Sequence, residues 1–464
     1  MLIRRKSFLA LGAAGVQRRT PMHPVSRRAL LGGTAALTAA SALAACSNGS
    51  SGGGSSSDGI YFLNFKPESE AAFKEIAKTY QDAKGVEVKV VTAASGTYEQ
   101  TLKSEVAKSN PPTLFQMNGP IGLANWKDYA TDMSETETAK ALIDPSMGLK
   151  GEDGKIYGLP LANEGYGLIY NAAILNKYFT LPGAKVASID EVKGFDALKA
   201  LAEDMQTKKD QLGIKGVFAS TSLAPGEDWR WHTHLANYPL FYELRDANAT
   251  DTKAFKMTYG DQYKQIFDLY LNNSTVPKTE TSAKTVTDSM SEFALGQAAF
   301  VQNGNWAWSQ ISEVDGNTVK EEDIRFMPIY IGVEGEENSG IAIGTENYLT
   351  INSKASEAAQ KATGDFLTWL FTDPEGSKLA AEKLGIIAPY TAFAELAPED
   401  PLGKQVSEFM NNKDLYPINW VFQIFPSQDF KDQFGQHLSQ YASGKEDWAA
   451  VIEYVTTEWA AEKA

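Results

Sequence analysis

The chain has 464 residues, enough for two or three domains, so a small disulfide-stapled or metal-stapled scaffold is excluded. Hydrophobic residues make up 43% and charged residues 22%, which is typical of a globular protein rather than a disordered or membrane-embedded one. With 58 acidic against 43 basic residues, the net charge of −15 argues against nucleic acid or an anionic lipid surface as the main partner.

The first 45 residues have the charge pattern of an export signal. They contain seven Lys/Arg and no Asp/Glu, and Arg27 and Arg28 precede an uncharged stretch, 29–43, that is too short and too weakly apolar for a membrane span. We therefore predict that residues 1–45 are a signal peptide, with Met22 as an alternative start. The arginine pair leaves both the twin-arginine and the general secretion route open.

Cys46 is the only cysteine, which excludes disulfides, Cys-rich metal sites and thioredoxin-type chemistry. Residues 43–46, LAAC, resemble the lipobox of bacterial lipoproteins, and the resemblance implies that Cys46 is lipidated at the bacterial cell membrane. The alternative is a free cysteine beside an ordinary signal peptide. The Ser/Gly-rich stretch 46–59 is predicted to be a flexible tether with a reach of about 20 Å.

From residue 60 onward the pattern alternates between strand and helix. An apolar strand is predicted at 60–63, a helix from Glu68 to Gly85, a strand at 86–91, a helix at 97–109 and a strand at 113–117. Further helices are predicted at 195–206, 262–271, 289–295, 360–371, 375–384 and 448–459. Further strands are predicted at 214–219, 298–302, 324–329 and 348–351. This alternation predicts an α/β fold of two lobes, each a mainly parallel sheet flanked by helices.

Catalytic and metal-binding motifs are scarce. His232 and His234 would share one face of a strand but diverge on a helix, and two imidazoles without a third ligand make a poor zinc site. No nucleophile elbow, His-Glu-x-x-His motif or phosphate-binding loop occurs. We expect no metal and no cofactor, whereas a glycosidase carboxylate pair stays open.

Aromatic residues gather with amides and acids in three short stretches, 229–231, 303–308 and 416–420. A neutral sugar offers apolar C–H faces and a rim of hydroxyls, so its site needs flat rings beside fixed polar groups. On a strand or turn, Trp306 and Trp308 would point the same way. The alternative is that each tryptophan belongs to the core.

Three segments, at 157–171, 293–306 and 366–387, are specific enough to indicate a family. The first contains YGLP followed by EGYGLIYN, the second FALGQAAF followed by Asn303, Gly304 and Trp306, and the third DPEG and LGI. The chain resembles the family 1 extracellular solute-binding proteins of carbohydrate ABC importers, the maltose-binding-protein-like group.

The resemblance implies a periplasmic-binding-protein-like fold with a ligand cleft between two lobes, 60–165 plus 340–395 and 166–339 plus 396–464. It implies that Trp306 stacks on sugar, that Glu164 accepts hydrogen bonds from it, and that Lys66 lies in the cleft. The remaining predicted ligand contacts are Gln116, Asn118, Glu227, Trp229, Trp308 and Trp420. Gln116 and Asn118 differ from the ring and acid of the best-known member, which leaves the sugar open.

We therefore hypothesise an extracytoplasmic, lipid-anchored binding protein that captures an oligosaccharide by lobe closure and delivers it to the permease of an ABC importer. It is expected to be monomeric, to catalyse no reaction, to bind no nucleic acid and to touch the membrane only through Cys46. The alternatives are a secreted glycoside hydrolase and a surface scaffold without a small ligand. The sequence does not distinguish among sugars, polyols or chain lengths.

Overall fold

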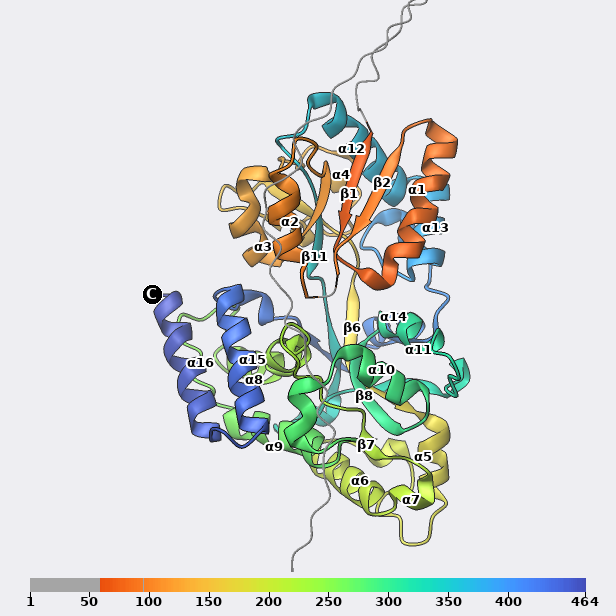
Figure 1. Ribbon diagram of the computed structural model, residues 1–464, viewed down its shortest axis with the longest axis vertical. Coiled ribbons are helices and arrows are strands. Elements are labelled where there is room, and N and C mark those ends of the chain that lie inside the picture. Colours follow the sequence, from red (N-terminus) through yellow and green to blue (C-terminus); the bar gives the residue numbers. More distant parts are fainter. Residues whose placement is uncertain (1–58, 95) are drawn as a thin grey trace, which may run out of the picture. The chain divides into compact units, whose positions relative to one another are not determined.

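The computed structural model describes residues 59–94 and 96–464, which fall within one compact unit, Ser55–Ala464. The predicted signal peptide, Cys46 and nearly all of the predicted tether lie outside the described residues. The described residues form an α/β fold with two sheets, and we call each sheet with its helices a lobe (Figure 1). None of the helices in this part of the chain is long and apolar enough for a membrane span.

The sheet of lobe 1 has the strand order β2-β1-β3-β11-β5-β4. Its strands are β1 (Ile60–Asn64), β2 (Val88–Thr92), β3 (Leu114–Asn118), β4 (Leu149–Lys150), β5 (Ile156–Pro160) and β11 (Asn347–Ile351). Its helices are α1 (Glu70–Lys84), α2 (Tyr98–Val106), α3 (Gly119–Trp126), α4 (Glu137–Lys140), α12 (Glu357–Thr372) and α13 (Pro374–Leu384).

β1 is buried along its whole length, because helices cover both faces of its sheet. Ile60 and Phe62 pack against α1, α12 and α13, whereas Leu63 packs with residues of α2 and α3. Figure 1 shows α1 and α13 on one side of this sheet and α2 and α3 on the other. Alternate side chains of a strand point to opposite faces, so a strand covered on both sides needs an uninterrupted apolar sequence. The stretch 60–63 has such a sequence.

α1 follows the helical periodicity of its apolar residues. Phe73, Ile76 and Tyr80 are its large buried side chains, and they recur three or four residues apart on the face that packs on the sheet. Gly85 ends the helix with φ of 73°, a left-handed conformation that favours glycine.

The sheet of lobe 2 has the order β12-β10-β6-β8-β7, with β9 paired to β6. Its strands are β6 (Glu164–Asn171), β7 (Gly216–Phe218), β8 (Ala298–Gly304), β9 (Ile324–Met327), β10 (Ser339–Gly344) and β12 (Tyr416–Asn419). Its helices are α5 (Ala172–Phe179), α6 (Phe195–Thr207), α7 (Lys209–Leu212), α8 (Asn237–Asp246), α9 (Gly260–Asn272), α10 (Val286–Ala294), α11 (Ala307–Ser312), α14 (Pro401–Asn411), α15 (Gln428–Ala442), α16 (Trp448–Glu462) and a π-helix at Arg230–Leu235.

Both sheets are mixed: most strands of each sheet run in one direction, as predicted, but β4 and β11 in lobe 1 and β6 in lobe 2 run against them. β1 pairs with β2 and β3 in parallel, but β11 runs antiparallel to both β3 and β5, and β6 runs antiparallel to β8, β9 and β10. β6 and β11 run against their neighbours because the chain reaches each of them directly from the other sheet. A strand entered in this way does not need the helical crossover that makes neighbouring strands parallel.

The chain passes between the two sheets at 161–163, at 345–346 and between α13 and α14. β10 pairs with β6 and β12 in lobe 2, whereas the sequence analysis placed residues from 340 onward in lobe 1. The second passage therefore falls after Gly344. The helices and strands predicted from periodicity are all present within a few residues of their expected bounds.

Candidate functional site

A cavity of about 860 Å³ is lined by residues of both lobes. Lobe 1 contributes the loop after β1, the start of α2 and the end of β3, and lobe 2 contributes the loop before the π-helix, the start of α11 and one face of α15. Seven of the nine predicted ligand contacts line it, namely Lys66, Asn118, Glu164, Glu227, Trp229, Trp306 and Trp420. The other two, Gln116 and Trp308, do not.

Four rings from three separate segments form an aromatic cluster on this cavity. His234 lies at its centre, with ring centroids 4.7 Å from Trp229, 5.7 Å from Trp306 and 5.9 Å from Trp420. Trp229 and Trp306 are themselves 6.1 Å apart and are only partly buried. The cluster thus lines the cavity with flat aromatic rings, the side chains with which proteins contact the apolar face of a ring-shaped ligand.

Trp306 is placed by the end of β8. It is the residue before the first turn of α11, and its indole folds back over the backbone of Gly304. A Cβ atom at residue 304 would lie 2.1 Å from the Trp306 ring, so only glycine permits this position.

The expectation that Trp308 points the same way as Trp306 was wrong. Residues from 307 onward are helical rather than extended, so side chains two positions apart diverge around the helix axis. Trp308 packs against an apolar cluster of lobe 2 that includes Ile311 and Val406. It is therefore a packing residue and not part of the cavity wall.

A buried ion pair joins the two lobes at the cavity. Lys66 follows β1 of lobe 1, and its Nζ lies 2.5 Å from Oε1 of Glu164, the first residue of β6 in lobe 2. Glu68 Oε1 lies 3.8 Å from the same ammonium, and Lys66 also sits 5.4 Å from the Trp306 ring centroid.

Burial alone would lower the pKa of the Lys66 ammonium, but the carboxylates of Glu164 and Glu68 outweigh it and raise that pKa. Burial raises the pKa of Glu68, against the opposing effect of Lys66. Because Glu164 is only 6% exposed, removing Lys66 would leave a buried charge without its counterion.

The two polar residues at the end of β3, Gln116 and Asn118, differ in their exposure to the cavity. Asn118 lines the cavity, but Gln116 is fully buried beneath it and was wrongly expected at its surface. The Oε1 of Gln116 accepts a hydrogen bond of 2.5 Å from the backbone N–H of Phe65, and its Nε2 donates to Asn347 at 3.2 Å. Through the hydrogen bond to Phe65, Gln116 supports the loop that carries Lys66.

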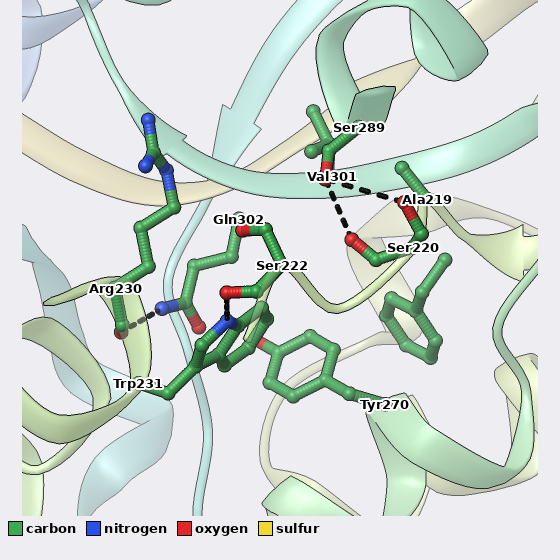
Figure 2. Close-up of a pocket in the computed structure, with 10 residues that line it drawn as sticks. Ala219, Ser220, Ser222, Arg230, Trp231, Tyr270, Ser289, Val301 and Gln302 are labelled. Atoms are coloured by element: carbon green, nitrogen blue, oxygen red, sulfur yellow. Dashed lines mark hydrogen bonds between the residues drawn. The ribbon is translucent and has the colours of Figure 1, made fainter. Parts of the chain in front are cut away.

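Arg230 enters the cavity wall from the π-helix. Its guanidinium stacks 3.9 Å from the centroid of the Trp229 ring, and its Nε donates to Asn303 Oδ1 at 3.2 Å. Burial lowers the pKa of Arg230, with Glu227 and Glu68 acting against that effect. The backbone of Arg230 is held in place by Gln302, whose Nε2 donates a hydrogen bond of 2.8 Å to the Arg230 carbonyl (Figure 2).

The two histidines diverge, as expected for a helical segment. His232 Nε2 lies 3.6 Å from Asp228 Oδ1, whereas His234 stacks on Tyr166 with ring centroids 4.1 Å apart. Burial, together with the charge of Arg230, lowers the pKa of His234 well below its usual value, so this ring is neutral. Within residues 59–94 and 96–464 no group of three His, Cys, Asp or Glu is arranged to hold a metal ion.

Several lining residues were missed by the sequence analysis, among them Glu68, Arg230, Glu346 and Lys431. Glu346 lies in the passage between β10 and β11, and burial raises its pKa while Lys431 opposes that effect. The sequence signal that could have identified Glu346 as a site residue was its position between two short apolar strands. Lys431 is 6% exposed on α15, and its sequence neighbourhood carried no signal of a site.

The arrangement combines flat rings with charged and amide groups that donate and accept hydrogen bonds. It therefore suits a solute with both apolar faces and many hydroxyl groups.

Comparison with known proteins gives a family match and a set of similar structures. A family model described as bacterial extracellular solute-binding protein matches residues 75–408. The melibiose/raffinose/stachyose-binding protein MelE of Bacillus subtilis (strain 168) is 31% identical over 87 residues, which cover 18% of this chain and 20% of that protein.

Two solved structures illustrate the fold similarity. A chitin oligosaccharide binding protein aligns with a TM-score of 0.69 at 18% identity, over 87% of this chain and 98% of its own. The maltose-bound MalE3 of T. maritima aligns with a TM-score of 0.63 at 16% identity, over 86% of this chain and 98% of its own.

Proposed function

The chain belongs to the bacterial extracellular solute-binding protein family, and we propose that its solute is an oligosaccharide, delivered unaltered to the permease of an ABC importer. The named relatives support the sugar class, since they bind melibiose, raffinose and stachyose, chitin oligosaccharides or maltose.

The observation that carries this proposal is the presence of Trp306, Glu164 and Lys66 on one cavity. The indole gives a flat surface for the C–H face of a sugar ring. The carboxylate beside it accepts hydrogen bonds from hydroxyl groups, and the ammonium donates them. Trp229 and Trp420 extend the same surface.

The cavity wall also suggests how binding is signalled. Because lining residues come from both lobes, a sugar that touches both walls has more contacts when the lobes are closer together. Its differential affinity then favours the closed arrangement, which a permease can recognise. We propose that the three passages between the sheets absorb the movement.

We further propose that the protein is a monomer held at the outer face of the cell membrane by a lipid on Cys46. The sequence around Cys46 supports this, and so does the family's extracellular role. The Ser/Gly-rich stretch after Cys46 would allow the cavity to reach a membrane-embedded permease.

A thermal-shift screen tests the function. Purified protein is heated with mono-, di- and trisaccharides of the galactose, glucose and N-acetylglucosamine types. A bound sugar should raise the melting temperature by an amount that grows with the ratio of its concentration to its dissociation constant. Chromatography of the recovered sugar distinguishes the alternatives. Shortened sugars would indicate a glycoside hydrolase, and no shift with any sugar would indicate a scaffold.

A further inference from the structure

α15 has two faces of opposite character. Phe430, Phe434 and Leu438 are buried against the core of lobe 2, four residues apart. The opposite face lines the cavity with seven residues at helical spacing, namely Gln428, Lys431, Asp432, Gly435, Gln436, Ser439 and Gln440. We call these residues the α15 stripe.

The α15 stripe is long and polar. At 1.5 Å per residue, the twelve steps from Gln428 to Gln440 span roughly 18 Å, and the stripe contains no aromatic residue. The side chains of Gln436, Ser439 and Gln440 make no hydrogen bond to any other described residue. Lys431 is nine-tenths buried, yet it forms no ion pair within the described part of the chain and faces the cavity.

The stripe continues beyond the aromatic cluster. Gly435 packs on the segment that carries the cluster, since a Cβ there would lie 2.0 Å from Asp228 Oδ2. Gln436, Ser439 and Gln440 lie on the following turns, farther along the helix. From lobe 1, Tyr98, Glu99 and Gln100 at the start of α2 line the same cavity.

We propose that the α15 stripe is a second sugar subsite, which binds the distal units of an oligosaccharide of three or more units through hydrogen bonds rather than by stacking. This rests on the proposed function. The amides of Gln436 and Gln440 and the hydroxyl of Ser439 can each both donate and accept hydrogen bonds, as sugar hydroxyls can. The cavity volume of about 860 Å³ is near the upper end of the range for small-molecule sites, roughly 300–1,000 Å³. A disaccharide bound at the aromatic cluster would therefore leave the α15 stripe unfilled.

The test is a comparison of affinities across ligand length. Calorimetry is performed with melibiose, raffinose and stachyose, and in parallel with maltose, maltotriose and maltotetraose, on the wild type and on Gln436→Ala/Gln440→Ala. Gln433→Ala is the matched control, because Gln433 is exposed on the same helix and does not line the cavity.

The wild type should bind the tri- and tetrasaccharide more tightly than the disaccharide of the series that it recognises. The double variant should lose about tenfold in affinity for the longer sugars, as expected for one or two lost hydrogen bonds, and keep its affinity for the disaccharide. Gln433→Ala should match the wild type at every length.

The subsite is overturned if the double variant weakens all lengths equally, or if wild-type affinity does not rise beyond the disaccharide. In both cases the proposed function stands, because a sugar is still bound. A wild type that binds neither series overturns the proposed function for these sugars, and the subsite with it.

Discussion

Trp306 owes its place in the cavity to its neighbours. Gly304 leaves room for the indole, and α11 begins directly after it, which turns the ring back over the strand end. Lys66 lies 5.4 Å from the ring centroid, so the ring is also close to the ion pair with Glu164. A sugar stacked on Trp306 would therefore have hydrogen-bonding groups at its edge.

Replacing Trp306 with alanine should weaken sugar binding by about 2 kcal/mol or more, roughly thirtyfold, because buried aromatic contacts dominate such interfaces. Calorimetry with the tightest sugar measures the loss. Trp308→Ala is the matched control: it should lower the melting temperature, since Trp308 packs against a buried cluster, and leave the affinity unchanged. Equal affinities of Trp306→Ala and the wild type would remove Trp306 from the site.

His234 predicts a specific dependence of stability on pH. Its pKa is lowered by burial, so the folded protein keeps this ring neutral while the unfolded chain protonates it below about pH 6.5. Unfolding then takes up a proton, and the stabilisation present above pH 6.5 is lost as the pH falls.

Between pH 6 and pH 5 this loss should approach about 1.4 kcal/mol per pH unit. His234→Phe keeps a ring against Tyr166 and removes the titrating group, so its free energy of unfolding should fall less steeply with acid. Urea denaturation at pH 7, 6 and 5 makes the comparison. If the free energy of unfolding fell equally steeply with acid for both proteins, unfolding would take up no proton at His234, and the ring would already be protonated in the folded protein.

At this scale, sequence reasoning identified residue types better than side-chain directions. Trp306 and Glu164 were predicted from their motifs and lie on one cavity. Gln116 and Trp308 were placed there as well, and the Trp308 prediction failed because its segment is helical rather than extended. Gln116 and Asn118 are two residues apart on β3, yet Gln116 is buried and Asn118, the last residue of the strand, lines the cavity, with no signal in the sequence.

At the scale of elements, the strongly periodic helices were predictable and the strands of lobe 2 were less so. α1 has a clean apolar stripe, whereas β6 begins with Glu164 and contains two glycines, and β10 contains Ser339 and two glycines. Their sequences do not alternate between apolar and polar residues, because both strands are buried on both faces along most of their length. The π-helix that carries Arg230 and His234 has no known sequence signature to predict it.

The close approach of α15 to this π-helix can be tested at Gly435. An alanine would normally stabilise a helix interior by roughly 1 kcal/mol relative to glycine. Here its Cβ would meet the Asp228 carboxylate, so Gly435→Ala should instead destabilise by about 1–3 kcal/mol and weaken sugar binding.

Gln433→Ala, on the exposed face of α15, serves as the control and should change stability by less than about 0.5 kcal/mol. Both variants are compared by urea denaturation and calorimetry. A Gly435→Ala protein more stable than the wild type would mean that α15 lies farther from Asp228 than described.

At the scale of the whole molecule, the alternation of strands and helices predicted two α/β lobes but not which strands run against the rest of their sheet. The direction is set by long-range connections: β11 and β6 enter their sheets from the other lobe and run antiparallel to their neighbours. A local pattern holds no information on such connections. The family resemblance indicated them, although it placed the second passage a few residues early.

The proposed lipid anchor can be tested at Cys46. Cys46→Ser removes the thiol that lipidation needs, so the protein should move from the membrane fraction to the soluble extracytoplasmic fraction. Immunoblotting of fractionated cells measures the distribution, and the Trp306→Ala protein, with Cys46 intact, should stay with the membrane. A Cys46→Ser protein retained in the membrane fraction would rule out this anchor.

We propose that one cavity, formed by both lobes, holds an intact oligosaccharide against Trp306 and Glu164. A crystal structure of the protein with the tightest sugar from the thermal-shift screen tests it most directly. We expect an uncleaved sugar in the cavity, with one ring stacked on the Trp306 indole and a hydroxyl within hydrogen-bonding distance of Glu164. A sugar bound elsewhere, or one that touches neither residue, would contradict it.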